Sequence, residues 1–559
     1  MALKKELSFL DVFCLAAGAM ISSGIFILPG VAFSSAGPGV IVSYFLAGVL
    51  AICGTLSVIE LTTALPKAGG DYFFIHTTFG PFVGTVSGLL SWIAISLKTA
   101  FAIFGISELL YLFFGTNVLL SSLLLCVFFT FLNIKGTKEA SSYEVFLVMV
   151  LLLLLALFVL QGVNDVQPQS FSPFAPHGWR AVFSTAGLIF ISFGGLLNIA
   201  SMSEEVKRPK RTIPLAMLAA VICITAVYTL ILTITVGIVP AGELAASLTP
   251  IADCARLSVG DIGYYTVIIA SLLAFVTTAI AGLLSASRYP VGLSRDKLLP
   301  SFIAKADPRY QTPKTAILLT GFIIAVSLLL DLKTLAKTAS TVVICSYILT
   351  NISLIVLRES KLQNYRPSFR VPLYPFLPAV NILVFTALII DMGITAAEVS
   401  LGFIGIGILL YFFFGRTNSQ KEYALIHLLE RIVNKKLTSH SLETELRQIL
   451  HERDEVKKDR FDDFITEAEI VDLGDISEKS EAFQFLSQKA AAVLSLDPKM
   501  ILRLLREREE ESSTAISPFI AIPHIIIEGE KRFALIIARS RKGIRFSQAY
   551  NEVKAVFLL

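Results

Sequence analysis

The sequence predicts an all-α membrane protein followed by a soluble α/β domain. Hydrophobic residues make up 55% of the 559 residues, and the mean hydropathy of +0.73 is far above that of a soluble domain. Two apolar segments are interrupted in the middle by small residues, at Gly18–Gly24 and at Phe193–Gly195. From about residue 421 onward, a charged composition replaces the long apolar runs.

Apolar runs long enough to cross about 30 Å of hydrocarbon predict the membrane crossings. Such runs lie near residues 10–30, 40–62, 83–113, 117–134, 142–162, 181–200, 213–239, 262–287, 314–331, 335–357, 376–395 and 398–415. They predict twelve transmembrane helices in a membrane domain of residues 1–420, and they leave residues 421–559 for the soluble domain.

The distribution of Lys and Arg predicts the orientation of these helices. Up to residue 421, nearly all of these cations fall in connections on the side of the N-terminus, whereas Arg180, Arg256 and Lys333 fall on the opposite side. Under the positive-inside rule, both ends of the membrane domain are cytoplasmic. We therefore expect a multi-pass protein of the cell membrane.

The six cysteines show neither a disulfide framework nor the spacing of metal ligands. No metal and no cofactor is therefore expected. The expected partners are a small-molecule substrate and the lipid bilayer, without nucleic acid.

The first interruption reads Gly18-Ala-Met-Ile-Ser-Ser-Gly24. A helix broken inside a membrane leaves carbonyl groups at the end of its first half and N–H groups at the start of its second half, and only protein or a wet cavity can receive them. These two ends match the ammonium and the carboxylate of an α-amino acid. The expected substrate-binding residues are Ala19, Met20, Ser22, Ser23, Gly24, Phe190, Ile191, Ser192, Phe193 and Gly194.

A second interpretation of the first interruption is close helix packing, because small residues spaced four apart, such as Gly18 and Ser22, are common at helix contacts in membranes. The interruption at Phe193-Gly194-Gly195 in the sixth segment favours a binding site instead. Paired interruptions in corresponding positions are typical of transporters built from inverted repeats.

Several motifs also resemble amino acid permeases of the amino acid/polyamine/organocation superfamily. The motifs are Gly18-Ala-Met-Ile-Ser-Ser-Gly-Ile-Phe26, Phe190-Ile-Ser-Phe-Gly-Gly-Leu196, Ser203-Glu-Glu-Val-Lys-Arg-Pro-Lys-Arg-Thr-Ile-Pro214, Ser287-Arg-Tyr-Pro-Val-Gly-Leu-Ser-Arg-Asp-Lys-Leu-Leu-Pro300, Pro308-Arg-Tyr-Gln-Thr-Pro313 and Phe369-Arg-Val-Pro-Leu-Tyr-Pro375. The resemblance covers roughly residues 8–415. It implies a five-plus-five inverted repeat with two trailing helices, and a substrate held by the broken first and sixth helices.

The chain departs from this family at Gly194 and Leu197, where many members carry polar or acidic residues. No charged side chain in the sixth interruption would then pair with a cationic substrate. The resemblance therefore implies transport of a neutral amino acid by alternating access, without enzymatic activity. A sensor that binds an amino acid and signals through its tail is the alternative.

Charged residues near the cytoplasmic ends of the sixth and eighth segments are gate candidates. Glu204, Glu205 and Arg208 follow the sixth segment, and Arg288 and Arg295 end the eighth. A solvated rim obeying the charge rule is the plain alternative. Exposed pairs contribute little singly, so gating requires a cooperating network.

Lys98 lies midway along the third segment, where an ammonium group in hydrocarbon is costly. It is a coupling candidate, either as a group that carries a proton or as a fixed charge in place of a bound cation. A lysine that extends through a wet crevice is the plain alternative. Thr277 and Thr278 of the eighth segment are further coupling candidates, because their hydroxyls could serve a cation.

The tail combines helical spacing at Tyr423–Val433 and Ser441–Ile449 with strand-like runs at Phe533–Ala538 and Val553–Leu559. Its Ile520-Ala-Ile-Pro-His524 motif resembles fructose/mannitol-type IIA domains of the bacterial phosphotransferase system. The resemblance implies a prokaryotic source, a phosphocarrier protein or another cytoplasmic regulator as partner, and a domain that is incomplete at its C-terminus.

The same resemblance implies that His524 accepts a phosphoryl group, with Arg508, Ser513 and Thr514 stabilising the added charge. Ser517, Pro518 and Phe519 replace the glycines usual before the histidine. A regulatory or docking domain that keeps the fold, and a relay component of the phosphotransferase system, are both open interpretations.

Overall fold

A computed structural model describes most of the chain and divides it into two compact units, Met1–Asp454 and Glu455–Leu559. The described residues are 7–67, 69–135, 140–305, 307, 312–362, 365–415, 423–433, 446, 468–474, 476–494, 496–511, 513–517, 519–527, 534–546 and 552–558.

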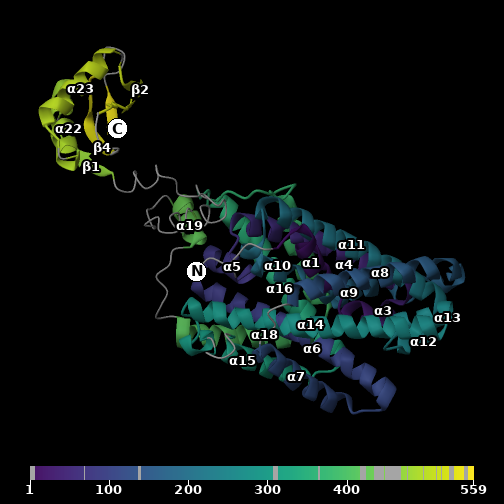
Figure 1. The fold of residues 1–559 in the computed structure, drawn as a ribbon. Coiled ribbons are helices and arrows are strands. Elements are labelled where there is room, and N and C mark those ends of the chain that lie inside the picture. The colour runs from purple at the N-terminus through teal and green to yellow at the C-terminus, as the bar shows by residue number, and fades with distance from the viewer. Residues whose placement is uncertain are drawn as a thin grey trace. The chain divides into compact units, whose positions relative to one another are not determined.

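The first unit, called the membrane unit below, is a bundle of helices (Figure 1). Its helices are α1 (Phe9–Met20), α2 (Ser23–Phe26), α3 (Leu28–Ala36), α4 (Val40–Ala64), α5 (Asp71–Phe79), α6 (Pro81–Phe114), α7 (Val118–Lys135), α8 (Ala140–Gly162), α9 (Gly178–Ile189), α10 (Leu196–Ser201), α11 (Pro209–Ile238), α12 (Ala241–Ala246), α13 (Pro250–Val259), α14 (Asp261–Arg295), α15 (Lys314–Ser327), α16 (Leu332–Glu359), α17 (Phe376–Asp391), α18 (Ile394–Leu410) and α19 (Ala424–Val433).

Seven helical stretches among the described residues are long and apolar enough to cross a membrane: Leu28–Ala64, Pro81–Phe114, Val118–Lys135, Val145–Asp165, Pro209–Ile238, Asp261–Arg295 and Leu332–Glu359. Shorter apolar helices lie at Phe9–Met20, Gly178–Phe193, Lys314–Ser327, Phe376–Asp391 and Ser400–Phe414. The protein is therefore a multi-pass membrane protein. That all twelve stretches cross the bilayer, with an internal five-plus-five repeat, remains a prediction.

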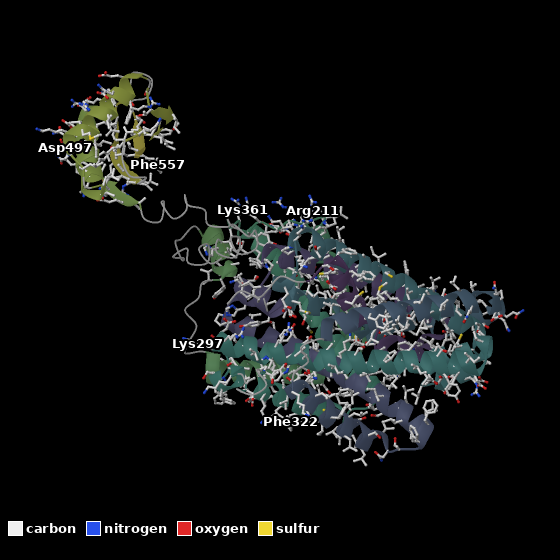
Figure 2. The ribbon with its side chains drawn as sticks, viewed as in Figure 1. Arg211, Lys297, Phe322, Lys361, Asp497 and Phe557 are labelled. Atoms are coloured by element: carbon white, nitrogen blue, oxygen red, sulfur yellow. The ribbon has the colours of Figure 1, made fainter. Side chains whose placement is uncertain are left out.

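The outer surface of the membrane unit is apolar. Phe322 is 67% exposed and Leu383 is 70% exposed, which fits contact with lipid. Lys297 and Lys361 lie at the end of the unit that holds α5 and α19, whereas Phe322 lies on its flank (Figure 2). Helix α6 runs through the middle, where it packs against α14 and α16 and is buried along most of its length.

The first interruption lies where the sequence places it. Helix α1 ends at Met20, Ile21 and Ser22 form a bend, and α2 begins at Ser23. The second half of this segment continues from α2 into α3.

The sixth segment differs from the expectation of an unwound chain. Phe190–Phe193 forms a 3-10 helix, η4, between α9 and α10. Gly194 and Gly195 keep right-handed helical backbone angles, with φ of −69° and −74°. Small residues allow this tightening without full unwinding, and a 3-10 stretch in mid-helix is a common form of functional hinge.

The boundary between the two units also differs from the position suggested by composition. The change in composition lies near residue 421, whereas the compact units meet after Asp454. Between these positions lies α19, the helix predicted at Tyr423–Val433, and it contacts α5 and α16 of the membrane unit. Nearly all of the second predicted helix, Ser441–Ile449, lies outside the described residues.

The second unit is an α/β domain. Its elements are β1 (Glu469–Asp472), α22 (Lys479–Leu494), α23 (Pro498–Glu511), β2 (Ala515–Ser517), β3 (Ile520–Ala521), β4 (Ile536–Ile544) and β5 (Val553–Leu558). The five strands form one mixed sheet in the order β1-β4-β5-β3-β2. Strand β4 pairs antiparallel with β5, β1 runs parallel to β4, and α22 packs against α23 and β4.

Candidate functional site

The carbonyl groups at the first interruption are held by side chains from distant helices. Lys98 of α6 donates from its Nζ to the carbonyl of Ala19. The hydroxyl of Tyr228 on α11 donates to the carbonyl of Met20 at 2.8 Å, and that of Tyr44 on α4 donates to the carbonyl of Gly24 at 2.8 Å. We expected the carbonyls of Ala19 and Met20 to be open to a substrate ammonium; in this structure protein side chains occupy them.

Ser340 of α16 supports the sixth segment in a similar way. Its hydroxyl donates to the carbonyl of Leu188 at 2.8 Å and accepts the N–H of Ile191 at 3.0 Å. The ring of Phe190 packs edge-on against Tyr347 and Phe385, so it belongs to the core of the bundle. A side chain from α16 therefore satisfies the backbone groups that the change from α-helix to 3-10 helix would leave without partners.

The two interrupted segments touch each other at glycines. A Cβ atom on Gly24 would lie 2.2 Å from Oγ of Ser192, and one on Gly195 would lie 2.6 Å from the carbonyl carbon of Ala19. Neither distance is compatible with a side chain. The Oγ atom of Ser192 is buried and has no hydrogen-bond partner among the described residues.

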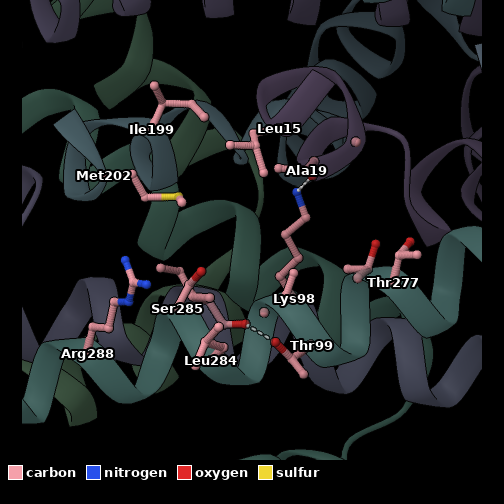
Figure 3. Close-up of a pocket in the computed structure, with 15 residues that line it drawn as sticks. Leu15, Ala19, Lys98, Thr99, Ile199, Met202, Thr277, Leu284, Ser285 and Arg288 are labelled. Carbon is pink, nitrogen blue, oxygen red and sulfur yellow. Dashed lines mark hydrogen bonds between the residues drawn. The ribbon is translucent and has the colours of Figure 1, made fainter. Parts of the chain in front are cut away.

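A cavity of about 80 Å³ adjoins the contact between the segments. Its lining residues are Leu15, Gly18, Ala19, Ile95, Lys98, Thr99, Ile199, Met202, Thr277, Thr278, Ala281, Gly282, Leu284, Ser285 and Arg288. In Figure 3, Lys98 points to Ala19, with Arg288 to one side and Thr277 to the other. Small-molecule pockets usually exceed about 300 Å³, so an amino acid enters only if the surrounding helices move apart.

The predicted coupling residues lie along this cavity. The Lys98 side chain is 6% exposed, so it does not extend into open solvent. The Thr277 hydroxyl donates to the carbonyls of Leu273 and Ala274 in its own helix, at 3.0 Å each. The Thr278 hydroxyl is buried and has no partner among the described residues, which leaves it available to a ligand.

Two of the gate candidates come together beside the cavity, which Arg288 lines. Arg288 of α14 lies 3.7 Å from Glu205, with side-chain exposures of 43% and 27%. Arg208 and Arg295 are exposed, and the side chain of Glu204 lies outside the described part of the chain. The contact between Glu205 and Arg288 is long and partly exposed, so its energy alone is small.

The histidine of the second unit is exposed directly after β3. Arg508 donates from its Nε to the His524 Nε2 at 3.1 Å, and the His524 Nδ1 lies 3.1 Å from the carbonyl of Ile522. Because Arg508 needs an acceptor, the geometry assigns the proton to Nδ1 and the lone pair to Nε2. The nitrogen with the lone pair is the one that can attack phosphorus.

Ser513 and Thr514, the other two residues predicted to donate hydrogen bonds to the phosphoryl group, donate to Glu509 instead. Glu509 is only 8% exposed, and it accepts the backbone N–H of Thr514 at 2.9 Å and the hydroxyl of Ser513 at 3.3 Å. The Thr514 hydroxyl also donates to Glu509. The buried Glu509 carboxylate therefore places negative charge beside Ser513 and Thr514. Of the three predicted donors, Arg508 is the one that contacts His524.

Sequence reasoning did not find Tyr44, Tyr228 or Ser340. Each is an ordinary polar residue in an apolar helix, and Tyr228 lies 208 positions from the carbonyl that it serves. No local pattern in the sequence marks such a pair.

Segments of this kind, with a bend in the first and a 3-10 stretch in the sixth inside a multi-pass apolar bundle, are typical of membrane transporters. A family model described as "Amino acid permease" matches residues 7–415, and the chain belongs to this family, within the amino acid/polyamine/organocation superfamily. A second model, described as "Phosphoenolpyruvate-dependent sugar phosphotransferase system, EIIA 2", matches residues 463–559.

The curated relatives match the membrane unit. The branched-chain amino acid permease BcaP of Bacillus subtilis is 27% identical, over 75% of this chain and 95% of its own length. The methylthioribose transporter of the same organism is 26% identical, over 75% and 95% of the two chains. BcaP of Lactococcus lactis is 26% identical, over 74% and 94%.

Proposed function

We propose that the protein is a secondary transporter that moves a neutral amino acid across the cell membrane by alternating access, and that its IIA-like domain regulates this transport. The contact of the two interruptions through Gly24 and Gly195 is the observation that supports this proposal most. Two segments that meet without side chains between them can separate around a small solute and close again.

The chemistry of the cavity supports a neutral substrate. Its described lining carries the cations Lys98 and Arg288, the hydroxyls of Thr99, Thr277, Thr278 and Ser285, and apolar side chains, without a carboxylate. A cationic side chain of a substrate would find no counter-charge there. Two of the relatives are named as branched-chain amino acid permeases, which makes L-leucine the first probe.

The substrate carboxylate is assigned to the N–H groups of Ser22, Ser23 and Gly24, at the start of α2. The ammonium of the substrate would compete with Lys98 and Tyr228 for the carbonyls of Ala19 and Met20. Substrate binding would then require Lys98 and Tyr228 to release these two carbonyls. Lys98 is assigned the coupling role on the same grounds, because it holds the position a mobile cation would take.

Exchange of labelled L-leucine in liposomes tests the transport proposal. The purified full chain should exchange internal for external leucine, and unlabelled methylthioribose serves as the competing probe, because a relative is named for it. Binding of leucine without any exchange, under proton, sodium or counter-substrate gradients, would favour the sensor alternative.

A second function, phosphoryl acceptance at His524, is favoured by the bond from Arg508 to Nε2. In this proposal a phosphocarrier protein transfers its group to the exposed imidazole, and the added charge stays beside the guanidinium. The modification would regulate transport or pass to a further acceptor.

A further inference from the structure

The carboxyl group of Asp71 lies at the start of α5. Asp71 is fully buried. Its carboxylate accepts a hydrogen bond from the Ser91 hydroxyl of α6 and one from the Tyr289 hydroxyl of α14, the latter at 3.0 Å. Burial raises the pKa of Asp71 above its ordinary value, while these two hydrogen bonds act in the opposite direction.

Hydroxyl and backbone N–H groups account for the polar surroundings of this carboxylate. The Ser91 hydroxyl also lies 3.3 Å from that of Ser346 on α16. Other described titratable side chains on α5 and on the helices α16 and α19 that contact it include Tyr72, His76, Tyr347 and His427. Tyr72 donates to Asp296 instead, at 2.8 Å. The hydrogen bonds that lower the pKa of Asp71 come from Ser91, Tyr289 and the backbone of Asp71 and Tyr72.

A small cavity lies between Lys98 and the two hydroxyl residues that donate to Asp71. The cavity has about 10 Å³ and is lined by Ser91, Lys98 and Tyr289, together with Ala94, Ile95, Gly194, Leu197 and Val343. A volume of this size holds about one water molecule. The two hydroxyl residues that bind Asp71 therefore line the same cavity as Lys98.

Helix geometry supports this arrangement. Ser91 and Lys98 are separated by about two turns of α6, so they lie on the same face of the helix about 10 Å apart along its axis. Gly194 and Leu197 close the cavity from the sixth segment. At these two positions the chain carries no charge that would compete with Lys98.

We infer that Asp71 is the proton partner of Lys98, and that the two groups exchange a proton through the Ser91 and Tyr289 hydroxyls and one water molecule. The inference rests on the proposed transport function. It names Asp71 as the group that accepts the proton from Lys98, which the coupling role requires. It makes the protein a proton-coupled carrier, with Asp71 as the group that passes the proton to the cytoplasmic side of the predicted topology.

The proton transfer balances without any other reactant. An N–H bond of the Lys98 ammonium breaks as an O–H bond forms on the water molecule, and the water passes one proton to a hydroxyl. That hydroxyl passes its own proton to Asp71, to which both Ser91 and Tyr289 already donate. An ammonium and a carboxylate become an amine and a carboxylic acid, and each oxygen between them gains and loses one proton.

The transfer also acts on the first interruption. The Lys98 ammonium holds the Ala19 carbonyl through a charge-assisted hydrogen bond. Loss of the proton leaves a neutral amine, which binds the carbonyl more weakly and frees the end of α1 to move. Proton movement and the opening of the interrupted segments are thereby linked.

The test uses full-length protein in liposomes that contain a pH-sensitive dye. For one proton per leucine, an inward gradient of one pH unit supports up to about tenfold accumulation. We expect wild-type protein to accumulate leucine and acidify the interior, and Asp71→Asn to exchange leucine while both the accumulation and the acidification are lost. The matched control is Asp296→Asn, because Asp296 also accepts from a tyrosine, but that tyrosine, Tyr72, does not line the cavity.

The outcomes distinguish failure of the proton-transfer inference from failure of the transport proposal. Proton-driven accumulation by Asp71→Asn at the wild-type level overturns the inference and would leave Asp71 as a cap for α5. Leucine exchange by the wild type without proton movement overturns the inference but not the transport proposal, whereas no exchange at all overturns both. If Asp71→Asn does not fold, the Ser91→Ala, Tyr289→Phe double variant decides, because it keeps the carboxylate and removes the path; retained coupling there rejects the inference.

Discussion

At the scale of single residues, the first interruption depends on three donors that reach it from other helices. Lys98, Tyr44 and Tyr228 hold the carbonyls of Ala19, Gly24 and Met20. A buried carbonyl left without a partner costs about 1–3 kcal/mol. The bend at Ile21 and Ser22 is therefore stabilised by residues far away in the sequence.

The Tyr228→Phe substitution tests this dependence. It removes the hydroxyl that serves Met20 and keeps the ring that packs against Phe193 and Tyr44. We expect the variant to lose about 1–3 kcal/mol of stability, measured as a lower Tm in detergent. Tyr111→Phe is the control, because Tyr111 is 53% exposed and its loss of a hydroxyl should leave the Tm unchanged. An equal Tm for both variants would show that water replaces the hydroxyl.

Gly24 tests the contact between the two segments. A Cβ atom there would lie 2.2 Å from Oγ of Ser192 and 3.0 Å from its Cα. Because misplacement by about 1 Å can cost on the order of 100-fold in function, Gly24→Ala should reduce leucine exchange by about that factor. Gly402→Ala, at a helical glycine with open space around it, should have no effect.

A rescue variant separates the contact from general damage. Adding Ser192→Gly to Gly24→Ala removes the two nearest atoms that the new Cβ meets. We expect part of the exchange rate to return. Full exchange by Gly24→Ala alone would contradict the assigned contact.

At the scale of elements, hydrogen bonds hold the interrupted helices to the rest of the bundle, and the same helices border a cavity. Ser340 of α16 and Tyr228 of α11 hold the backbone, while α14 and α10 border the cavity. Arg288, which lines that cavity, forms an ion pair with Glu205. Movement of α1 and α10 away from α14 would open the cavity and break this pair.

Charge reversal tests the gate at this scale. Because a partly exposed pair contributes up to about 1 kcal/mol, Glu205→Arg or Arg288→Glu alone should change the leucine exchange rate by about fivefold. The double variant, which reverses the pair, should restore the rate. Arg211→Glu on the exposed start of α11 is the control for a change in net charge. A double variant no better than either single one would show that the charges act separately.

At the scale of the whole molecule, a transporter and a phosphotransferase-type domain share one chain. The two units have separate hydrophobic cores, so each can fold around its own apolar side chains. Helix α19 follows the last apolar helix and packs on α5, whose first residue is Asp71. In the proposed regulation, α19 is the last described helix of the membrane unit before the tail.

Phosphorylation of the tail tests this organisation. Incubation with a phosphorylated carrier protein should place one acid-labile group on His524, detected by mass spectrometry, and His524→Ala should abolish it. Arg508→Ala should slow labelling by about tenfold, since a charge-assisted hydrogen bond to the imidazole is lost. His177→Ala, in the membrane unit, should label normally, and absence of label on wild-type protein would reject the relay.

The sequence by itself determined the class of the protein and predicted the place of its functional site. Apolar runs, the Gly18–Gly24 interruption and the Ile520–His524 motif depend on local composition and spacing, which a linear chain displays directly. The permease and IIA-type families inferred from these motifs are confirmed.

The tertiary structure decided which groups meet. Only folding brings Tyr228 to Met20 and places Lys98 on the cavity shared with the donors to Asp71. It also decided that Phe190–Phe193 stays helical, because Ser340 supplies the missing backbone partners. Hydrogen bonds between residues more than 100 positions apart depend on how helices pack, and packing leaves no periodic pattern in a single sequence.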